Sequence, residues 1–142
     1  MREILFRGKT EKGEWVYGFY HNETSIESSS SDRKVTRHHI YTQDFDKFVK
    51  PETVGQFTGL TDKNGKKIFE GDIVKAIQTE YDEDKEQEPI VFEVIGEMIF
   101  EDACFGLRAK HFVDFYSPMW QEDNVELEVI GNIHDNPELL GE

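Results

Sequence analysis

The apolar residues of this chain fall into short runs, and turn-forming residues separate each run from the next. Several runs are rich in aromatic and β-branched residues, as at residues 15–20, 73–77 and 90–95. Short runs of this composition, bounded by glycine, asparagine and proline, are typical of β-strands. The sequence therefore predicts a mainly β fold with antiparallel strands joined by tight turns.

Local signals place two of the turns. A polar stretch separates residues 4–6 from residues 15–20, which predicts an N-terminal β-hairpin. Asn64 and Gly65 lie between two further apolar runs, and both residue types tolerate the positive φ that a type I′ hairpin turn demands. Gly71 marks another turn soon afterwards. Two closely spaced turns between apolar strands favour a small, tightly curled barrel.

Other segments predict loops and strand ends. Residues 21–34 contain one apolar residue, Ile26, so we expect an exposed, mobile loop there. The acidic run at residues 80–88 predicts a solvated loop. Strands on either side of Gly96 are expected to meet near it. Residues 40–49 fit neither the helical nor the strand period and are left open.

The C-terminal region predicts one more strand and a helical turn. Residues 125–129 alternate between apolar and acidic side chains, which indicates a half-exposed antiparallel strand. Asn136 offers a helix cap, and Pro137 suits the first helical position. We therefore expect a short C-terminal helical turn through Leu140.

The length of 142 residues is within the usual range of one domain and is sufficient for a core without disulfides. We expect a single domain over residues 1–142, with an N-terminal hairpin subregion at residues 1–50 and a barrel core at residues 51–142.

Charge is distributed unevenly along the chain, whose formal net charge is −14. Residues 1–75 carry thirteen Lys and Arg against twelve Asp and Glu, whereas residues 76–142 carry three against eighteen. A field of this sign repels phosphate backbones, which disfavours nucleic-acid binding by the whole molecule. A protein partner is expected to be basic.

Cysteine content and hydropathy indicate the cellular compartment in which the protein is expected. Cys104 is the only cysteine, which rules out a disulfide within the chain and favours a reducing, cytoplasmic location. Its neighbours suggest a small buried hydrophobe rather than a nucleophile. No apolar run reaches eighteen residues, so we expect neither a membrane span nor a signal peptide.

Histidines and acids offer weak candidate sites. His38 and His39 lie in a basic stretch, but adjacent strand residues point to opposite faces, so one metal ion between them is disfavoured. An exposed basic loop is the simpler interpretation. An acid–base set is conceivable among four residues of the second half: His111, Asp114, His134 and Asp135. No nucleophile elbow, phosphate-binding loop or metalloprotease motif is present, so we expect no enzyme, no cofactor and no metal.

Two further groups are candidate partner contacts. The aromatic run that contains Trp15 and Tyr17 suits a stacking or peptide-binding platform, with one face in the core and the other toward a partner. Lys66 and Lys67 belong to a cationic group on the central hairpin that also includes Lys63 and Lys75. This group is the only plausible nucleic-acid surface.

Three blocks of the sequence, in order along the chain, resemble the YopX family of phage and prophage proteins. They are REILFRG and GEWVYG at residues 2–8 and 13–18, PETVGQFTGL and IFEGDIV at residues 51–60 and 68–74, and LEVIGNI and NPELL at residues 127–133 and 136–140. The resemblance implies a phage or prophage origin, a mainly β fold similar to an SH3-type barrel around residues 71–74, and self-association. It implies no reaction and no functional residues, because the family has no assigned activity.

These observations support three hypotheses for the function. The first is a non-enzymatic interaction or assembly protein that binds itself, head to tail between its near-neutral and acidic halves, or binds a basic host or phage protein. The second is an acidic decoy that occupies the nucleic-acid-binding surface of a host protein. The third is weak nucleic-acid binding through the cationic hairpin.

Overall fold

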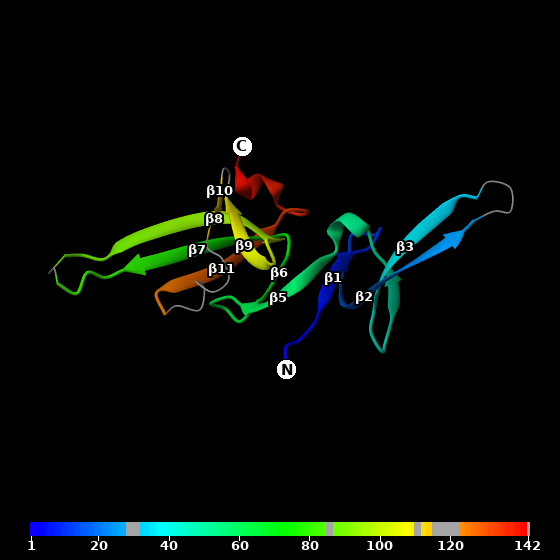
Figure 1. Ribbon diagram of the computed structural model, residues 1–142, viewed down its shortest axis with the longest axis horizontal. Helices are drawn as coiled ribbons and strands as arrows, with labels where there is room; N and C mark the ends of the chain where they lie inside the picture. The colour runs from blue at the N-terminus through cyan, green and yellow to red at the C-terminus, as the bar shows by residue number, and fades with distance from the viewer. Residues whose placement is uncertain (28–31, 85–86, 110–111, 115–122, 142) are drawn as a thin grey trace. The chain divides into compact units, whose positions relative to one another are not determined.

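Antiparallel pairing between strands organises the chain, as the sequence predicts. In this computed structural model, residues 1–27, 32–84, 87–109, 112–114 and 123–141 are described. In hydrogen-bonding order, the strands form a six-stranded sheet β4-β3-β2-β1-β5-β6 and a five-stranded sheet β10-β9-β8-β7-β11 (Figure 1). The mainly β fold is therefore confirmed.

The chain divides into two compact units, residues 1–57 and 58–142. Unit 1 contains β1 (Phe6–Lys9), β2 (Trp15–Ile26), β3 (Lys34–Tyr41), β4 (Asp46–Phe48) and the 3₁₀ helix η1 (Pro51–Thr53). Strand β5 (Gly55–Thr61) begins in unit 1 and ends in unit 2. Unit 2 continues with β6 (Lys67–Phe69), β7 (Asp72–Glu80), β8 (Ile90–Glu101), β9 (Cys104–Ala109), β10 (Phe112–Asp114), β11 (Val125–Asn132) and the 3₁₀ helix η3 (Pro137–Leu140).

Unit 1 begins with the predicted N-terminal hairpin, in which Lys9 pairs with Trp15. Its core lies on one face of β2 and β3 and contains the buried residues Val16, Ile40 and Val49. Residues 51–57, with η1, belong to this unit. Thr53 of η1 is buried, and its hydroxyl accepts a 2.8 Å hydrogen bond from the N–H of Lys9.

The loop expected at residues 21–34 is wrong over much of its length. Residues 21–26 continue β2 and pair with β3 as far as Ile26 opposite Lys34. Residues 28–31, with most of the serine run, lie outside the described residues. Polar strands persist here because the backbone ladder needs no apolar side chains, and cross-strand contacts such as Thr24 to Thr36 at 2.9 Å support it. Strands β3 and β4 occupy the stretch left open.

Unit 2 has a core of its own, formed by side chains of β6, β7, β8, β9 and β11. Its buried members are Ile68, Val74, Ala76, Met98, Phe105, Leu107 and Leu127. The SH3-type barrel expected over residues 51–142 is not confirmed. The described strands form an open sheet whose edge strands, β10 and β11, each pair with one neighbour in that sheet, so no closed barrel forms among them. None of the described helices is long and apolar enough to cross a membrane.

The turn between β5 and β6 occurs where predicted, with a different geometry. The N–H of Gly65 binds the carbonyl of Asp62, and the N–H of Asp62 binds the carbonyl of Lys66. Gly65 has a φ of +77°, whereas Asn64 is not among the residues with positive φ. This is a three-residue loop with a type I turn and a glycine bulge, so the type I′ expectation is wrong.

The Asp62 carboxylate explains that geometry. One of its oxygens accepts hydrogen bonds from the N–H groups of Asn64 and Lys66, each at 2.9 Å. The other oxygen accepts a 3.0 Å bond from the N–H of Val129 in β11. Asp62 is 7% exposed. Burial opposes ionisation, but the three N–H donors prevail and lower the pKa of Asp62 below its usual value.

Two expectations for the rest of unit 2 have different outcomes. Strands do not end at Gly96, because β8 runs through it without interruption. The glycine is needed where β8 passes close to the backbone of β9.

The C-terminal helical turn is confirmed as η3, with Pro137 in its first turn. Asn136 is at the cap position, but its side chain accepts a bond from the N–H of Asn132 instead of capping η3.

Replacing the buried carboxylate is expected to destabilise the fold. Asp62→Asn should lower the free energy of unfolding by about 1–3 kcal/mol near neutral pH, because an amide has one acceptor oxygen for three donors. A pKa that is lowered on folding contributes stability above the unfolded value, and this contribution is lost as pH falls through the folded value. Urea unfolding at about pH 7 and about pH 3 should therefore show that acid lowers the free energy of unfolding less in the variant than in the wild type. An identical loss in both proteins would contradict this role.

Gly96→Ala is expected to lower the free energy of unfolding by about 1–3 kcal/mol, because overpacking must displace the neighbouring strand. The added Cβ would lie 2.7 Å from the carbonyl oxygen of Arg108. The matched control is Val91→Ala on the same strand, where the side chain is 59% exposed. Thermal unfolding followed by circular dichroism measures both. Equal melting temperatures for the two variants would show that β8 and β9 separate at little cost.

Candidate functional site

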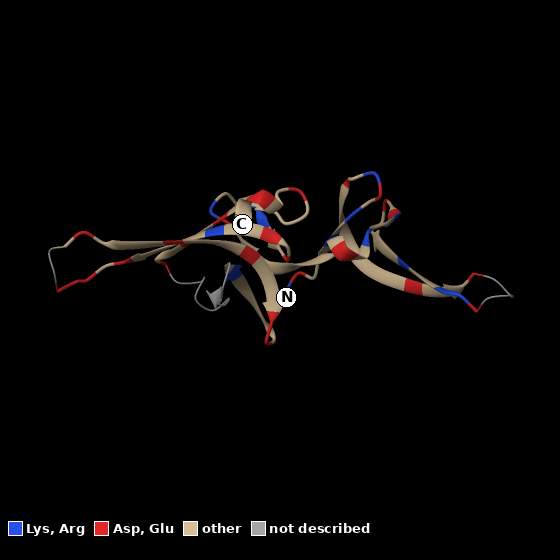
Figure 2. Cartoon of the chain, turned by 90° about the horizontal axis from the view of Figure 1, so that it is seen from above, with Lys and Arg blue, Asp and Glu red and all other residues tan. Residues whose placement is uncertain are grey.

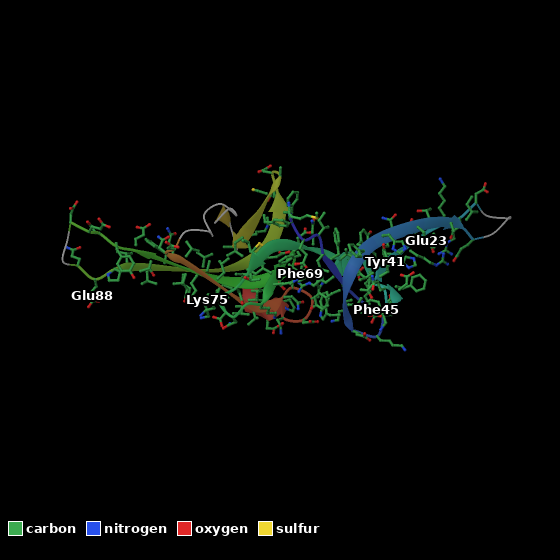
Figure 3. All side chains as sticks on the ribbon, turned by 90° about the horizontal axis from the view of Figure 1, so that it is seen from below. Glu23, Tyr41, Phe45, Phe69, Lys75 and Glu88 are labelled. Atoms are coloured by element: carbon green, nitrogen blue, oxygen red, sulfur yellow. The ribbon has the colours of Figure 1, made fainter. Side chains whose placement is uncertain are left out.

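Strand β8 has an edge that is unpaired among the described residues. Strand β9 pairs with β8 from Glu97 to Glu101, whereas β7 pairs with β8 from Ile90 to Glu97. Residues 90–96, here called the β8 edge, therefore pair with β7 alone among the described strands, and only Gly96 at the end lies against Arg108 of β9. In Figure 1 this part of β8 runs with β7 as a long ribbon. Figure 3 shows Lys75 within this ribbon and Glu88 near its tip.

The direction of the backbone groups along this edge follows from the ladder. The N–H of Thr79 binds the carbonyl of Asn124, so Thr79 directs its backbone groups away from β8. Its partner in the ladder is Val91, which must direct its own N–H and C=O away from β7. The same alternation applies to Glu93 and Ile95. The β8 edge thus presents hydrogen-bonding groups in the pattern that an added strand requires.

Apolar side chains line both faces of the β8 edge. The exposed fractions are 59% for Ile90, 59% for Val91, 46% for Phe92 and 37% for Ile95. Alternation places Ile90 and Phe92 on the face that carries the core farther along the sheet, and Val91 and Ile95 on the other face. Exposed apolar side chains on both faces of a strand indicate a surface that another chain can cover.

Unit 2 carries the negative charge of the protein. Residues 58–142 contain seven Lys and Arg against twenty-one Asp and Glu, whereas residues 1–57 contain nine of each kind. Acidic residues flank the tip of the β7–β8 ribbon (Figure 2). Residues 81–84, 87 and 88 form the loop that was predicted there, whereas Glu80 is the last residue of β7. The one charged residue of the β8 edge is Glu93, which lies 3.8 Å from the Lys75 amine. A field of this sign attracts positive charge.

A second candidate surface lies in unit 1, on the side of β2, β3 and β4 opposite the core. We call it the aromatic face, and it consists of Tyr17, Phe19, His21, His39, Tyr41, Asp46 and Phe48. The registers place Phe19 opposite Tyr41, and His21 opposite His39. The rings of Phe19 and Tyr41 are 5.7 Å apart, and both side chains are exposed. This unit has no net charge to repel a second copy.

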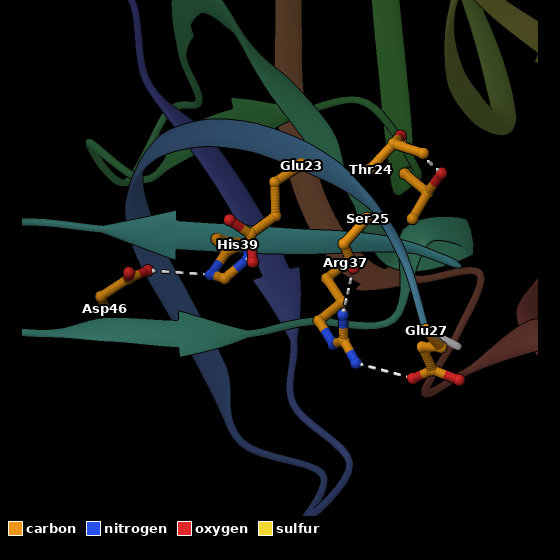
Figure 4. A network of polar contacts seen from close by, with 8 residues as sticks. Glu23, Thr24, Ser25, Glu27, Arg37, His39 and Asp46 are labelled. Atoms are coloured by element: carbon orange, nitrogen blue, oxygen red, sulfur yellow. Dashed lines mark hydrogen bonds and ion pairs between the residues drawn. The ribbon is translucent and has the colours of Figure 1, made fainter. Parts of the chain in front are cut away.

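Histidine 39 has acidic neighbours on both sides. Its Nδ1 lies 3.2 Å from a carboxylate oxygen of Asp46, and its Nε2 lies 3.5 Å from one of Glu23 (Figure 4). The His39 and His21 rings are stacked with centroids 4.4 Å apart. His38 points the other way and binds the Tyr20 hydroxyl at 2.7 Å. The two adjacent histidines therefore do face opposite sides, but they belong to a strand, and the expected exposed basic loop is wrong.

The structure places the predicted partner contacts as follows. Tyr17 is 46% exposed on the aromatic face. Trp15 is partly buried, and the Arg7 guanidinium carbon lies 4.8 Å from the centroid of its ring. Lys66 is exposed at the end of the β5–β6 turn, and Lys67 is partly buried in β6. The aromatic and lysine pairs therefore belong to different units.

Two of the four lysines in the cationic group, Lys63 and Lys75, lie close to carboxylates. The amine of Lys63 lies 3.2 Å from Glu126 and 3.3 Å from Glu128. Hydrogen bonds to these two carboxylates raise the pKa of Lys63. Lys75 is paired with Glu93, as described above. Lys63 and Lys75 therefore place positive charges among the carboxylates of β8 and β11.

The residues considered for catalysis are not brought together in the described structure. The N–H groups of His134 and Asp135 bind the side-chain oxygen of Asn132 in a turn after β11. His111 lies outside the described residues, and only the backbone of Asp114, in β10, is described. Cys104 is half-buried, with Sγ 3.5 Å from the carbonyl of Glu101.

One half-buried carboxyl, Glu97, has a perturbed pKa. Burial raises this pKa, and the charge of Arg108 partly opposes the rise. Raised carboxyl pKa values are frequent in catalytic sites. Here the neighbour is a cross-strand arginine rather than a nucleophile or a second acid. The pair is therefore a structural feature at the point where β9 ends.

Sequence reasoning missed the β8 edge and the contribution of His21. The apolar run at residues 90–95 was recognised, but its exposure depends on where β9 ends. The juxtaposition of His21 and His39 depends on the register of β2 and β3. A sequence signal exists for the two histidines, because each is five residues from the ladder pair Ile26 and Lys34. Finding it requires the strand prediction that the polar residues 21–26 did not support.

Comparison with known proteins places the chain in a family. A solved structure of protein EF1440 from Enterococcus faecalis is similar, with 24% sequence identity, a TM-score of 0.47, and coverage of 99% of this chain and 99% of that chain. Among curated proteins no match was found. The family model described as YopX protein matches residues 5–141. Because that match spans nearly the whole chain, this protein belongs to the YopX family.

Proposed function

We propose that this protein is a non-enzymatic interaction module that binds an extended, basic segment of a partner protein by strand addition at the β8 edge. The observation that carries the proposal is an edge with outward backbone groups and exposed apolar side chains on both faces. Strand addition uses these two features together, since main-chain bonds supply affinity and alternate side chains supply specificity. The reducing setting favoured by a lone cysteine makes the cytoplasm its proposed place of action.

The composition of the β8 edge supports this role. Proteins usually protect exposed edges with lysine, proline, bulges or short strands, because an unprotected edge pairs with other chains. Residues 90–96 contain neither lysine nor proline. The ladder with β7 is continuous over these residues, with no register shift. An edge that is long, regular and apolar is a cost to solubility, which a binding role explains.

The charge of unit 2 favours a basic partner over a second copy at this edge. Two copies would bring together two units that each carry an excess of fourteen acidic residues. A basic segment would instead be attracted, and its association rate would fall as salt rises. The acidic decoy and nucleic-acid alternatives are less favoured, because Lys63 and Lys75 place positive charges among the carboxylates of β8 and β11 and are themselves paired with them.

The test of strand addition removes one outward hydrogen-bond donor. Val91→Pro eliminates an N–H that points away from β7, so the ladder with β7 keeps its bonds, as at edge positions where proline is tolerated. The matched control, Val91→Thr, keeps the N–H and the β-branched shape. Affinity capture from a lysate of the bacterial host, followed by mass spectrometry, should recover a basic protein with the wild type and with Val91→Thr. Recovery with Val91→Pro should fall at least about tenfold, which corresponds to the net worth of one or two backbone bonds.

Three results would reject the proposal. They are equal recovery with Val91→Pro, retained proteins that are acidic or neutral, and recovery of no protein other than this one. Circular dichroism of Val91→Pro must show the strand content of the wild type, so that a lower recovery reflects the edge and not unfolding.

A second candidate function, self-association, is favoured by the aromatic face. Four aromatic side chains are exposed on it: Tyr17 46%, Phe19 56%, Tyr41 44% and Phe48 58%. Aromatic residues are enriched at protein interfaces. Residues 1–57 carry equal numbers of acidic and basic residues, so contact between two such faces meets no net repulsion within the unit. The occupant of this face would be a second copy of the chain.

Self-association through the aromatic face is expected to depend on Phe19. Sedimentation equilibrium should show a concentration-dependent dimer that Phe19→Ser weakens at least about tenfold, since an interfacial aromatic is commonly worth more than about 1 kcal/mol. The matched control is Phe100→Ser, because Phe100 is 55% exposed and lies in the other unit. Added salt should strengthen the dimer by screening the acidic units. A monomer at all concentrations, or equal weakening by both variants, would exclude this interface.

A further inference from the structure

Two buried ring nitrogens on the aromatic face have no hydrogen-bond partner among the described residues. They are Nδ1 of His21 and Nε2 of His39. His39 is 6% exposed, so water reaches its ring poorly. Leaving a buried polar atom without a partner costs about 1–3 kcal/mol. The two atoms belong to stacked neighbouring rings with centroids 4.4 Å apart, which indicates that a ligand of the two imidazoles is missing.

The surrounding acids complete a set of metal-ligating groups. Asp46 in β4 supplies an oxygen 3.2 Å from Nδ1 of His39. Candidate ligand atoms of His21, His39 and Asp46 all lie within 4.8 Å of one another. Glu23, two positions after His21 on the same face of β2, lies 3.5 Å from Nε2 of His39. Figure 4 shows His39 between the Asp46 and Glu23 carboxylates.

An ion triad without metal explains only part of this arrangement. The two carboxylates lie near both ring nitrogens of His39, with Asp46 on the Nδ1 side and Glu23 on the Nε2 side. Nδ1 of His21 still has no hydrogen-bond partner among the described residues. A divalent cation bound by both imidazoles would supply that partner.

We propose that His21, His39 and Asp46 bind one divalent transition-metal ion of the zinc class. Imidazole nitrogen with carboxylate oxygen is a donor set that suits Zn²⁺ and its neighbours in the first transition row, whereas Mg²⁺ and Ca²⁺ prefer oxygen alone. Ligands at roughly 2 Å from a tetrahedral ion lie roughly 3.3 Å apart, so side-chain rotations must close the present separations. Glu23 either provides the fourth ligand or accepts the remaining N–H of His39, as outer carboxylates do in many zinc sites.

The position of the site in the sheet gives it a structural role. Its three ligands come from β2, β3 and β4, so one ion would connect three adjacent strands. Strand β4 has three residues and pairs with β3 alone among the described strands. A bound ion would hold this short edge strand in place. The proposal concerns unit 1 and does not depend on strand addition at β8.

The test uses the untagged full chain after treatment with a chelator. Zn²⁺ is titrated by calorimetry, and Co²⁺ is titrated while the visible absorption of its d–d bands is recorded. We expect one ion per chain, bands typical of nitrogen and oxygen ligation, and a higher melting temperature with Zn²⁺ because a ligand specific to the folded state stabilises it. Absence of stoichiometric binding at micromolar Zn²⁺ would reject the site.

Three variants separate this site from binding elsewhere on an acidic protein. Asp46→Asn keeps the shape of an exposed side chain and is expected to weaken Zn²⁺ binding at least tenfold, and His21→Gln is expected to do the same. His38→Gln is the matched control, because His38 is adjacent to His39 but faces Tyr20 on the opposite side. It should bind as the wild type does. Unchanged affinity in the first two variants, or an equal loss in the third, would overturn the assignment.

Discussion

The alternation of side chains along paired antiparallel strands is the constraint on which the surfaces of this protein depend. In unit 1 it directs Val16 and Ile40 into the core and directs Phe19 and Tyr41 outward. In unit 2 it separates the apolar core face of β7, β8 and β11 from the face that carries Lys75 and Glu93. A shift of one residue in either register would exchange the two faces and bury charge in place of the core. The buried Asp62 carboxylate helps to fix the register in unit 2, because it binds both the β5–β6 turn and β11.

The same constraint makes the β8 edge a candidate binding surface. Where β9 ends, β8 continues beside β7 with its outer hydrogen-bonding groups in regular order. Ile90 and Phe92 lie on the same face of β8 as the core residues but outside the core, so solvent reaches these apolar side chains. The acidic residues around this ribbon create a field that attracts positive charge and repels negative charge. Membership in the YopX family is consistent with this account but names no partner and no reaction.

Several local predictions failed for reasons that particular residues explain. The strand at residues 21–26 was missed because its composition is that of a loop, and its stability comes from pairing with β3 rather than from burial of a face. Gly96 suggested a strand end, whereas it serves the close approach of β8 to Arg108. Asn64 suited a type I′ turn, but the preceding Asp62 side chain captured two backbone N–H groups and selected a type I turn with a bulge. In each case a contact between segments overrode a local preference.

Sequence alone determined the mainly β class, the N-terminal hairpin, the position of the β5–β6 turn, the acidic loop and the C-terminal helical turn. These features follow from local composition and side-chain period, which the chain carries residue by residue. The tertiary structure decided that the described strands close no barrel, that residues 90–96 lie at an edge among those strands, and that His21 lies against His39. Those outcomes depend on which strands become neighbours and in what register. Neighbours are chosen by the free energy of the whole assembly of strands, and no local pattern in the sequence contains that information.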